Sequence, residues 1–240
     1  MPNRTPSKRS EIRARNRRTD SRQRNVAILI VAAFALVVAF LLIWPNIRPV
    51  GDVKMPEIQT YTNANQNTLG DPNAPVRIDE YSDFQCPACD IFFQNTFPQL
   101  VTEYINTGKV YFVSNAFSFI DDRAATKESD RAAEAAYCAM DQGKFWEYAQ
   151  VIYANQTGEN IGDFTDRRLQ TFAEKLNLKM ADFNACFNSG KYAERIQTER
   201  QAGEDLGVDR TPSFAINGQL HDLTSYEGFF QAIDEIAAGK

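Results

Sequence analysis

The chain has 240 residues, of which 43% are hydrophobic and 24% are charged, with seventeen Phe and nine Tyr. This composition is that of a folded protein and excludes an intrinsically disordered chain. Residues 1–25 hold nine Lys or Arg against two acidic residues, a net +7, so the total of −5 leaves −12 on residues 26–240. An acidic body repels nucleic-acid phosphates, so we expect no nucleic-acid partner.

An uninterrupted apolar run, VAILIVAAFALVVAFLLIW, follows the basic tail at residues 26–44. As a helix rising ~1.5 Å per residue it would be roughly 28 Å long, close to the ~30 Å hydrocarbon thickness of a bilayer. It ends without the small-residue cleavage site of a signal peptide. We therefore predict a cytoplasmic basic tail at 1–25 and a transmembrane signal anchor at 26–44, which would place the body outside the cytoplasm on a single-pass membrane protein. The alternatives are a buried core helix and a cleaved signal peptide.

Residues 45–68 are rich in polar residues, contain scattered Pro and have no sustained hydrophobic period. Such a composition predicts a flexible linker. The remaining residues, 69–240, are enough for one domain with a sizeable core.

Hydrophobic periodicity and turn residues predict the elements of this domain in chain order. A strand at 76–81 leads into a helix that starts at Pro87 and ends near Gly108, with a kink expected at Pro98. A buried strand is predicted at 109–113. Five helices follow, near 126–141, 144–154, 165–176, 180–187 and 191–206.

The last predicted elements are a strand at 213–216, a two-residue turn at Asn217-Gly218, a strand at 219–221 and a helix at 225–238. The order is β-α-β, a helical block, then β-β-α. A thioredoxin fold has this order of parts, with a helical insertion at about 121–190. The predicted fold class is therefore α/β (α+β), thioredoxin-like with an inserted helical subdomain, preceded by one transmembrane helix.

The motif Cys86-Pro87-Ala88-Cys89 lies at the start of the helix that follows the first strand. The first sulfur of such a motif lies beside unpaired N–H groups and the positive end of the helix dipole, which favours the thiolate. Cys86 is then the attacking thiol and Cys89 the resolving one. One alternative is half of a zinc site, although the chain has only one His that could serve as a further ligand. The other is a purely structural disulfide.

Several stretches of the chain resemble the DsbA-like thioredoxin family of bacterial extracytoplasmic thiol-disulfide oxidoreductases. They are DPNAPVRIDEYSDFQCPAC, AAEAAYCAMDQGKFWEY, SGKYAERIQ and LGVDRTPSFAING, so the resemblance covers about residues 69–240. It implies a thioredoxin fold that carries a redox-active Cys86–Cys89 disulfide. We expect no cofactor beyond this disulfide and no metal.

The resemblance also implies roles for residues outside the motif. Thr211-Pro212 matches the family's cis-proline loop, which lies against the disulfide and pairs its backbone with substrate; an ordinary trans edge Pro is the alternative. Glu80 matches a buried acid that moves protons to and from the second thiol, and the alternative is an exposed strand carboxylate.

Cys138 and Cys186 match a second, structural disulfide found in some relatives. Two inert free thiols are the alternative. A bridge between them would stabilise the fold by roughly 2–4 kcal/mol without taking part in catalysis.

Two positions depart from the family pattern. The dipeptide Pro87-Ala88 replaces the Pro-His of the strongly oxidising prototype, and Ala brings no charge or hydrogen-bond donor to favour the thiolate. Arg210 stands where many relatives have Gly, and a cation there is expected to lower the pKa of Cys86.

The resemblance and the predicted anchor together favour a dithiol oxidase that introduces disulfides into exported proteins. Its expected partners are reduced or unfolded exported proteins and a quinone-linked thiol oxidase in the membrane. A disulfide isomerase or reductase would use the same site. A non-enzymatic alternative is an anchored chaperone-like module that binds unfolded chains in an apolar groove around Phe84, Phe92 and Pro212.

Overall fold

The computed structural model describes residues 25, 28–40, 50–123, 125–221 and 226–239. The chain divides into two parts, residues 1–49 and residues 50–240. In the first part, residues 28–40 are helical and their large apolar side chains are exposed. No helix in the described ranges is both long and apolar enough to cross a membrane. The basic tail 1–24 and residues 26, 27 and 41–44 of the predicted anchor lie outside these ranges.

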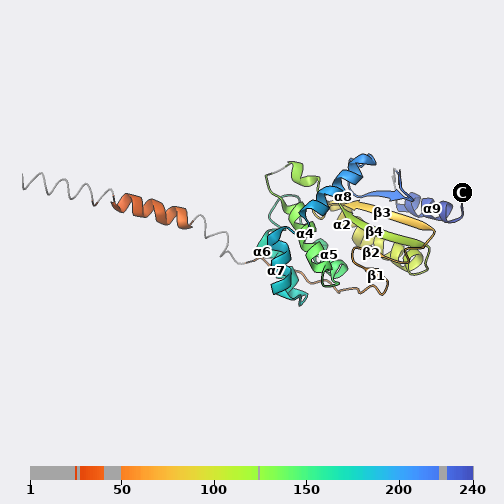
Figure 1. Cartoon of the computed structure of the whole chain (residues 1–240), viewed down its shortest axis with the longest axis horizontal. Coiled ribbons are helices and arrows are strands. Elements are labelled where there is room, and N and C mark those ends of the chain that lie inside the picture. The colour runs from red at the N-terminus through yellow and green to blue at the C-terminus, as the bar shows by residue number, and fades with distance from the viewer. Residues whose placement is uncertain (1–24, 26–27, 41–49, 124, 222–225, 240) are drawn as a thin grey trace, which may run out of the picture. The chain divides into compact units, whose positions relative to one another are not determined.

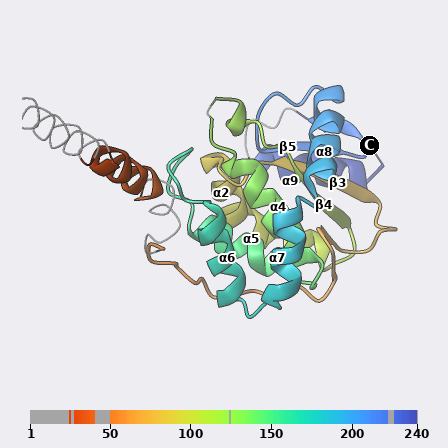
Figure 2. The same cartoon turned by 60° about the vertical axis from the view of Figure 1, so that its left-hand side comes forward.

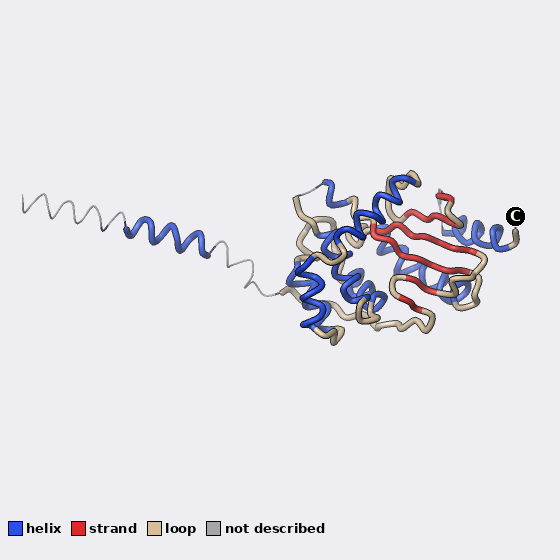
Figure 3. The backbone as a smooth tube through the Cα atoms, in the orientation of Figure 1, coloured by secondary structure: helices blue, strands red, loops and turns tan. Residues whose placement is uncertain are grey.

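A six-stranded sheet organises residues 50–240 (Figure 3). The strand order is β1-β2-β4-β3-β5-β6, with β3 and β4 parallel and every other neighbouring pair antiparallel. The strands are β1 (Ala64–Asn65), β2 (Thr68–Leu69), β3 (Val76–Ser82), β4 (Val110–Ala116), β5 (Ser213–Ile216) and β6 (Gln219–His221). The predicted strands β3 to β6 are thus confirmed, while β1 and the first residue of β2 fall in the segment predicted to be a linker.

The β5–β6 hairpin turns at the predicted two residues. Asn217 and Gly218 both have positive φ, 49° and 81°. Positive φ at both central residues matches the right-handed twist of the flanking strands, and Asn-Gly adopts it with little strain.

Helices cover both faces of the sheet (Figures 1 and 2). On one face, the rings of Phe92 and Phe229 lie 4.7 and 4.8 Å from the Phe214 ring of β5. On the other face, Gly203 approaches so closely that a Cβ there would lie 2.9 Å from the Tyr81 ring of β3. The helices that follow β4 in the chain are α4 (Glu128–Met140), α5 (Phe145–Ala154), α6 (Asp166–Lys175), α7 (Met180–Ser189), α8 (Ala193–Asp205) and α9 (Tyr226–Ala237).

Helices α4 to α7 form the inserted block predicted at about 121–190, preceded by the 3₁₀ turn η3 (Ile120–Arg123). In Figure 1 these four helices gather beside the sheet. Helix α7 ends at Gly190, whose φ of 65° is the left-handed C-cap conformation that glycine favours. The helical boundaries agree with the sequence-based ones to within about two residues, the usual uncertainty of helix ends.

The helix after the Cys-x-x-Cys motif is widened rather than simply kinked at Pro98. It runs through α2 (Pro87–Ile91), η1 (Phe92–Thr96), α3 (Phe97–Leu100) and η2 (Val101–Ile105), where η1 and η2 are π-helical turns. The Phe97 N–H donates to the Phe92 carbonyl across the wider turn. A π turn just before Pro98 relieves the clash of its ring with the preceding turn, and sequence periodicity does not reveal this adjustment.

The prediction of a flexible linker at 45–68 is wrong for its described part. Residues 50–61, here called the docked segment, lie along the helical block. The side-chain amide of Asn155 accepts from Lys54 N (2.9 Å) and donates to Lys54 O (2.7 Å), and Gln150 makes the same pair of bonds with Gln59, both 2.8 Å. The domain therefore begins before residue 69.

An aromatic anchor adds to these hydrogen bonds at the end of the docked segment. The ring of Tyr61 packs edge-on against Phe97 and Trp146, with ring centroids 6.0 Å apart in both pairs. The composition of this segment does not reveal the docking, because the backbone groups of Lys54 and Gln59 bond to two buried side-chain amides that are about 90 to 100 residues away in the chain.

Candidate functional site

Cys86 and Cys89 lie where β3 leads into α2. Cys86 is the N-cap residue of α2, with the extended backbone typical of that position, and Pro87 occupies the first helical turn. Cys86 is 6% exposed and Cys89 is fully buried. The sulfurs are not bonded to each other, so the structure describes the dithiol form. Of the pair, only Cys86 is within reach of solvent.

The two thiols have pKa values displaced in opposite directions. A hydrogen bond from the Cys89 thiol, helped by the N–H groups of Cys89 and Ala88, lowers the pKa of Cys86 to about 6 against the opposing effect of burial. Burial, and then the hydrogen bond to Cys86, raise the pKa of Cys89 well above its ordinary value. At neutral pH the pair therefore holds one thiolate and one thiol.

The loop before β5 faces this pair. The Sγ of Cys86 lies 3.3 Å from the carbonyl oxygen of Thr211, in hydrogen-bonding contact. The Thr211-Pro212 peptide bond is cis. The structure thus brings Thr211-Pro212 against Cys86 although the two are 125 residues apart in sequence.

Glu80 is buried on β3, with 5% of its surface exposed. Burial raises its pKa to about 7, against hydrogen bonds from the side chains of Ser114 and Ser82 that lower it, and the charge of Cys86 raises it further. The same Ser82 side chain also lies beside Cys89 and lowers its pKa. Glu80 is therefore a buried acid linked through one hydroxyl to the second thiol, and it can exchange a proton near neutral pH.

Asp83 is a second buried carboxyl beside the motif, which the sequence analysis did not single out. Its carboxylate accepts from the Ser129 hydroxyl (2.6 Å), Gln85 N (2.8 Å) and Ile120 N (3.1 Å), and its carbonyl accepts from Cys86 N (2.9 Å). Burial raises its pKa to about 7. Of these contacts, only the turn from Asp83 to Gln85 could be predicted from the local sequence, since Asp favours such turns. The contact with Ser129 could not, because Ser129 lies on a helix that is distant in the chain.

Arg210 lies beside the Thr211-Pro212 loop, with its side chain 68% exposed and paired with Asp209 at 2.9 Å. Asp209 offsets part of the charge that Arg210 would present to Cys86. The effect of Arg210 on the pKa of Cys86 stays a prediction.

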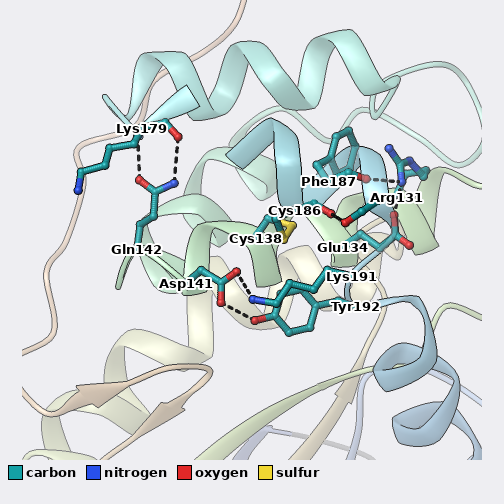
Figure 4. Close-up of a disulfide and its surroundings, with 11 residues drawn as sticks. Arg131, Glu134, Cys138, Asp141, Gln142, Lys179, Cys186, Phe187, Lys191 and Tyr192 are labelled. Atoms are coloured by element: carbon teal, nitrogen blue, oxygen red, sulfur yellow. Dashed lines mark hydrogen bonds and ion pairs between the residues drawn. A yellow bond between two sulfur atoms is a disulfide. The ribbon is translucent and has the colours of Figure 1, made fainter. Parts of the chain in front are cut away.

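Cys138 and Cys186 form a disulfide that joins α4 to α7, with their Cα atoms 5.8 Å apart (Figure 4). Beside it, the Gln142 amide accepts from Lys179 N (2.8 Å) and donates to Lys179 O (3.3 Å), which holds the same two helices together. The Cys138–Cys186 disulfide therefore cross-links two helices of the inserted helical block.

Among the residues that the structure describes, no group of three or more His, Cys, Asp or Glu side chains is arranged to hold a metal ion. The chemistry that the described site can support is that of its thiols and carboxyls. A thiolate beside a buried thiol, an acid with a pKa near neutrality and a cis-proline loop in contact with the sulfur are the parts needed for thiol-disulfide exchange on a thioredoxin fold.

Comparisons with known proteins agree with this class. A thioredoxin family model matches residues 62–235. The probable disulfide bond formation protein D of Bacillus anthracis is 31% identical over 192 residues, which cover 78% of this chain and 85% of that protein.

Two solved structures are similar in fold. BdbD from Bacillus subtilis (oxidised) has a TM-score of 0.65 at 20% identity and covers 77% of this chain and 100% of its own. Wolbachia pipientis alpha-DsbA1 has a TM-score of 0.62 at 25% identity, with 75% and 94% covered. The chain belongs to the thioredoxin family and is a DsbA-like thiol-disulfide oxidoreductase.

Proposed function

We propose that the protein is a membrane-anchored dithiol oxidase that introduces disulfides into exported proteins through Cys86 and Cys89. The observation that carries this proposal is the pKa of Cys86, which is lowered to about 6 while that of Cys89 is raised. A stabilised thiolate favours the reduced form of the enzyme, so the oxidised form gives up its disulfide readily.

The reaction starts from the Cys86–Cys89 disulfide. A substrate thiolate attacks the sulfur of Cys86, the Cys86–Cys89 bond breaks, and Cys89 leaves as a thiolate that takes up a proton. A second substrate thiolate then attacks the sulfur bonded to Cys86, which forms the substrate disulfide and releases Cys86 as a thiolate. Two electrons pass from the substrate dithiol to the enzyme, and the low pKa of Cys86 makes it the better leaving group in the second step.

Glu80 supplies the proton that Cys89 takes up. Its pKa of about 7 lets it carry a proton at neutral pH and regain one from solvent. The Thr211-Pro212 loop, whose carbonyl contacts the sulfur of Cys86, receives the substrate backbone beside the reacting bond.

The membrane anchor is part of this proposal. Its support is the uncharged run at 26–44 after a basic tail, together with the exposed apolar side chains of the helix at 28–40. An extracytoplasmic domain would meet reduced exported chains, and a quinone-linked membrane oxidase would restore its disulfide. The alternative of a chaperone-like module required an apolar groove around Phe84, Phe92 and Pro212. Phe92 is fully buried and cannot line an exposed groove.

The test is a single-turnover reaction of the oxidised protein with a reduced, unfolded two-cysteine substrate. We expect about one substrate disulfide per protein molecule and none with Cys86→Ser. Cys89→Ser cannot form the Cys86–Cys89 disulfide, so it is given a substrate that already carries a disulfide; the Cys86 thiolate should attack this bond, release one substrate thiol and accumulate as the mixed disulfide, because no Cys89 thiol resolves it. Failure to oxidise the dithiol substrate, combined with efficient reshuffling of a scrambled disulfide substrate, would overturn the oxidase in favour of an isomerase.

A further inference from the structure

A row of hydroxyl groups leads from the buried thiol Cys89 past Glu80. The Ser82 side chain lies beside both Cys89 and Glu80 and lowers the pKa of each. Glu80 and Ser114 are register partners in the parallel β3–β4 pair, and the Ser114 side chain lowers the pKa of Glu80. Glu80 therefore has one hydroxyl on the side of the thiol and a second one on β4.

A small cavity lies beside these hydroxyls, between the sheet and the helical block. Its volume of ≈ 10 Å³ is close to the space that one water molecule needs, and its lining includes four residues that carry hydroxyl groups, Ser82, Ser114, Tyr137 and Tyr153. Ser82 Oγ and Tyr153 Oη are 3.0 Å apart. A water there would have the two to four polar partners that buried waters require.

Tyr137 connects the cavity to a carboxylate near the surface. Its hydroxyl donates to Glu199 Oε2, which also accepts from Ala116 N at 2.9 Å. The other oxygen of Glu199 accepts from Arg195 Nε at 2.7 Å, and the Glu199 and Arg195 side chains are 13% and 31% exposed. Glu199 thus reaches solvent at one end and the cavity, through Tyr137, at the other.

The two tyrosines stay protonated at working pH, because burial raises the pKa of Tyr137 and of Tyr153 well above the ordinary value. Such a hydroxyl passes a proton only by accepting one as it donates its own. The titratable groups around Glu80 are Cys86, Cys89 and Tyr153, and none of them faces solvent as openly as Glu199 does.

We propose that Glu199, Tyr137, a water held in the cavity and Ser114 form a proton route between solvent and Glu80, which Ser82 extends to Cys89. The inference rests on the proposed function. When Cys89 leaves as a thiolate, the Ser82 hydroxyl gives it a proton and takes one from the Glu80 carboxyl. The Glu80 carboxylate then regains a proton through Ser114, the water, Tyr137 and Glu199, and the flow reverses when the dithiol is reoxidised.

The experiment measures how fast the oxidised protein is reduced by dithiothreitol in single turnovers, across pH and in H₂O and D₂O. The variants Tyr137→Phe and Ser114→Ala each remove one hydroxyl of the route. The matched control is Tyr148→Phe, since Tyr148 is also fully buried but donates to Leu169 O at 2.7 Å and does not line the cavity.

We expect both route variants to slow reduction roughly tenfold, less than the ~10²–10⁴-fold contribution of a general acid or base itself because Glu80 is still present, and to change its pH profile and solvent isotope effect. A small permeant acid such as formate should restore part of the rate. In Tyr137→Phe, which leaves the partners of Glu80 in place, the equilibrium with dithiothreitol and the pKa of Cys86 should not move, because a route changes rates and not end states. Ser114→Ala also removes an interaction that lowers the pKa of Glu80, so only its rate and pH profile are compared.

Wild-type rates in both variants would overturn the route, and so would an equal slowing in Tyr148→Phe or, in Tyr137→Phe, a slowing accompanied by a shifted equilibrium. These outcomes leave the proposed function standing as long as the wild-type protein exchanges disulfides. A wild-type protein that dithiothreitol reduces but that cannot oxidise a dithiol substrate would instead refute the oxidase.

Discussion

Cys86 and Cys89 carry the same functional group three positions apart, and their surroundings separate them. Cys86 is the N-cap of α2 and receives hydrogen bonds that stabilise its thiolate, whereas Cys89 is fully buried one turn later. Neither Pro87 nor Ala88 has a charged or polar side chain that could contribute to the difference between the two thiol pKa values. The pKa of Cys86 is therefore lowered by Cys89, by Thr211 and by the backbone N–H groups, which explains how a low value is compatible with Ala at position 88.

The pKa of Cys86 is the first value to measure. Ultraviolet absorbance of the thiolate, followed from acid to alkaline pH in the reduced protein, should show a transition with a midpoint of about 6. Cys86→Ser should remove this transition. Because the hydrogen bond from Cys89 is the largest cause, Cys89→Ala should move the midpoint upward. A wild-type midpoint near the ordinary value of 9.0 would contradict the account.

Glu80 should make the stability of the fold depend on pH. Its pKa rises from 4.5 to about 7 on folding, so the folded state binds the proton more tightly. Its contribution to stability is complete below pH 4.5 and is lost as pH rises through about 7, a loss of roughly 3 kcal/mol.

Glu80→Gln removes this contribution. Denaturant unfolding at pH values from 4.5 to 8 should show a decline in the free energy of unfolding that is smaller in the variant by roughly that amount. All other groups titrate in both proteins, so the comparison isolates Glu80. Parallel curves for the two proteins would show that Glu80 titrates normally.

The elements divide into those that local sequence specifies and those that it does not. The helices α4 to α9 and the β5–β6 hairpin follow from hydrophobic period, Gly stops and an Asn-Gly turn, and the sequence analysis predicted them. The docked segment at 50–61 depends on Gln150 and Asn155 from the helical block, so its own composition indicated only a linker.

The docked segment gives a prediction of its own. Asn155→Ala removes both hydrogen bonds to Lys54 and should destabilise the fold by about 1–3 kcal/mol. Limited trypsin digestion should then cleave after Lys54 faster than in the wild type. The control is Gln201→Ala, which removes an exposed amide that bonds Asp205 within one helix turn. Equal cleavage rates in Asn155→Ala and wild type would contradict stable docking.

For the whole molecule, the sequence predicted the thioredoxin order of elements, the insertion and the Cys86–Cys89 pair, because each depends on neighbouring residues. It did not predict the hydrogen bond between Asp83 and Ser129 or the one between Ser82 and Tyr153. The first joins the loop after β3 to α4, and the second joins β3 to α5. Buried polar partners of this kind are fixed by packing, and no local pattern encodes them.

The measurement that tests the central claim most directly is the reduction potential of the Cys86/Cys89 pair, determined by equilibration with glutathione redox buffers. A stabilised Cys86 thiolate beside a buried Cys89 thiol favours the dithiol form. We predict a value on the oxidising side, near the ~−120 mV of a strong dithiol oxidant. A value near the ~−270 mV of thioredoxin would contradict the account and assign the site to reduction.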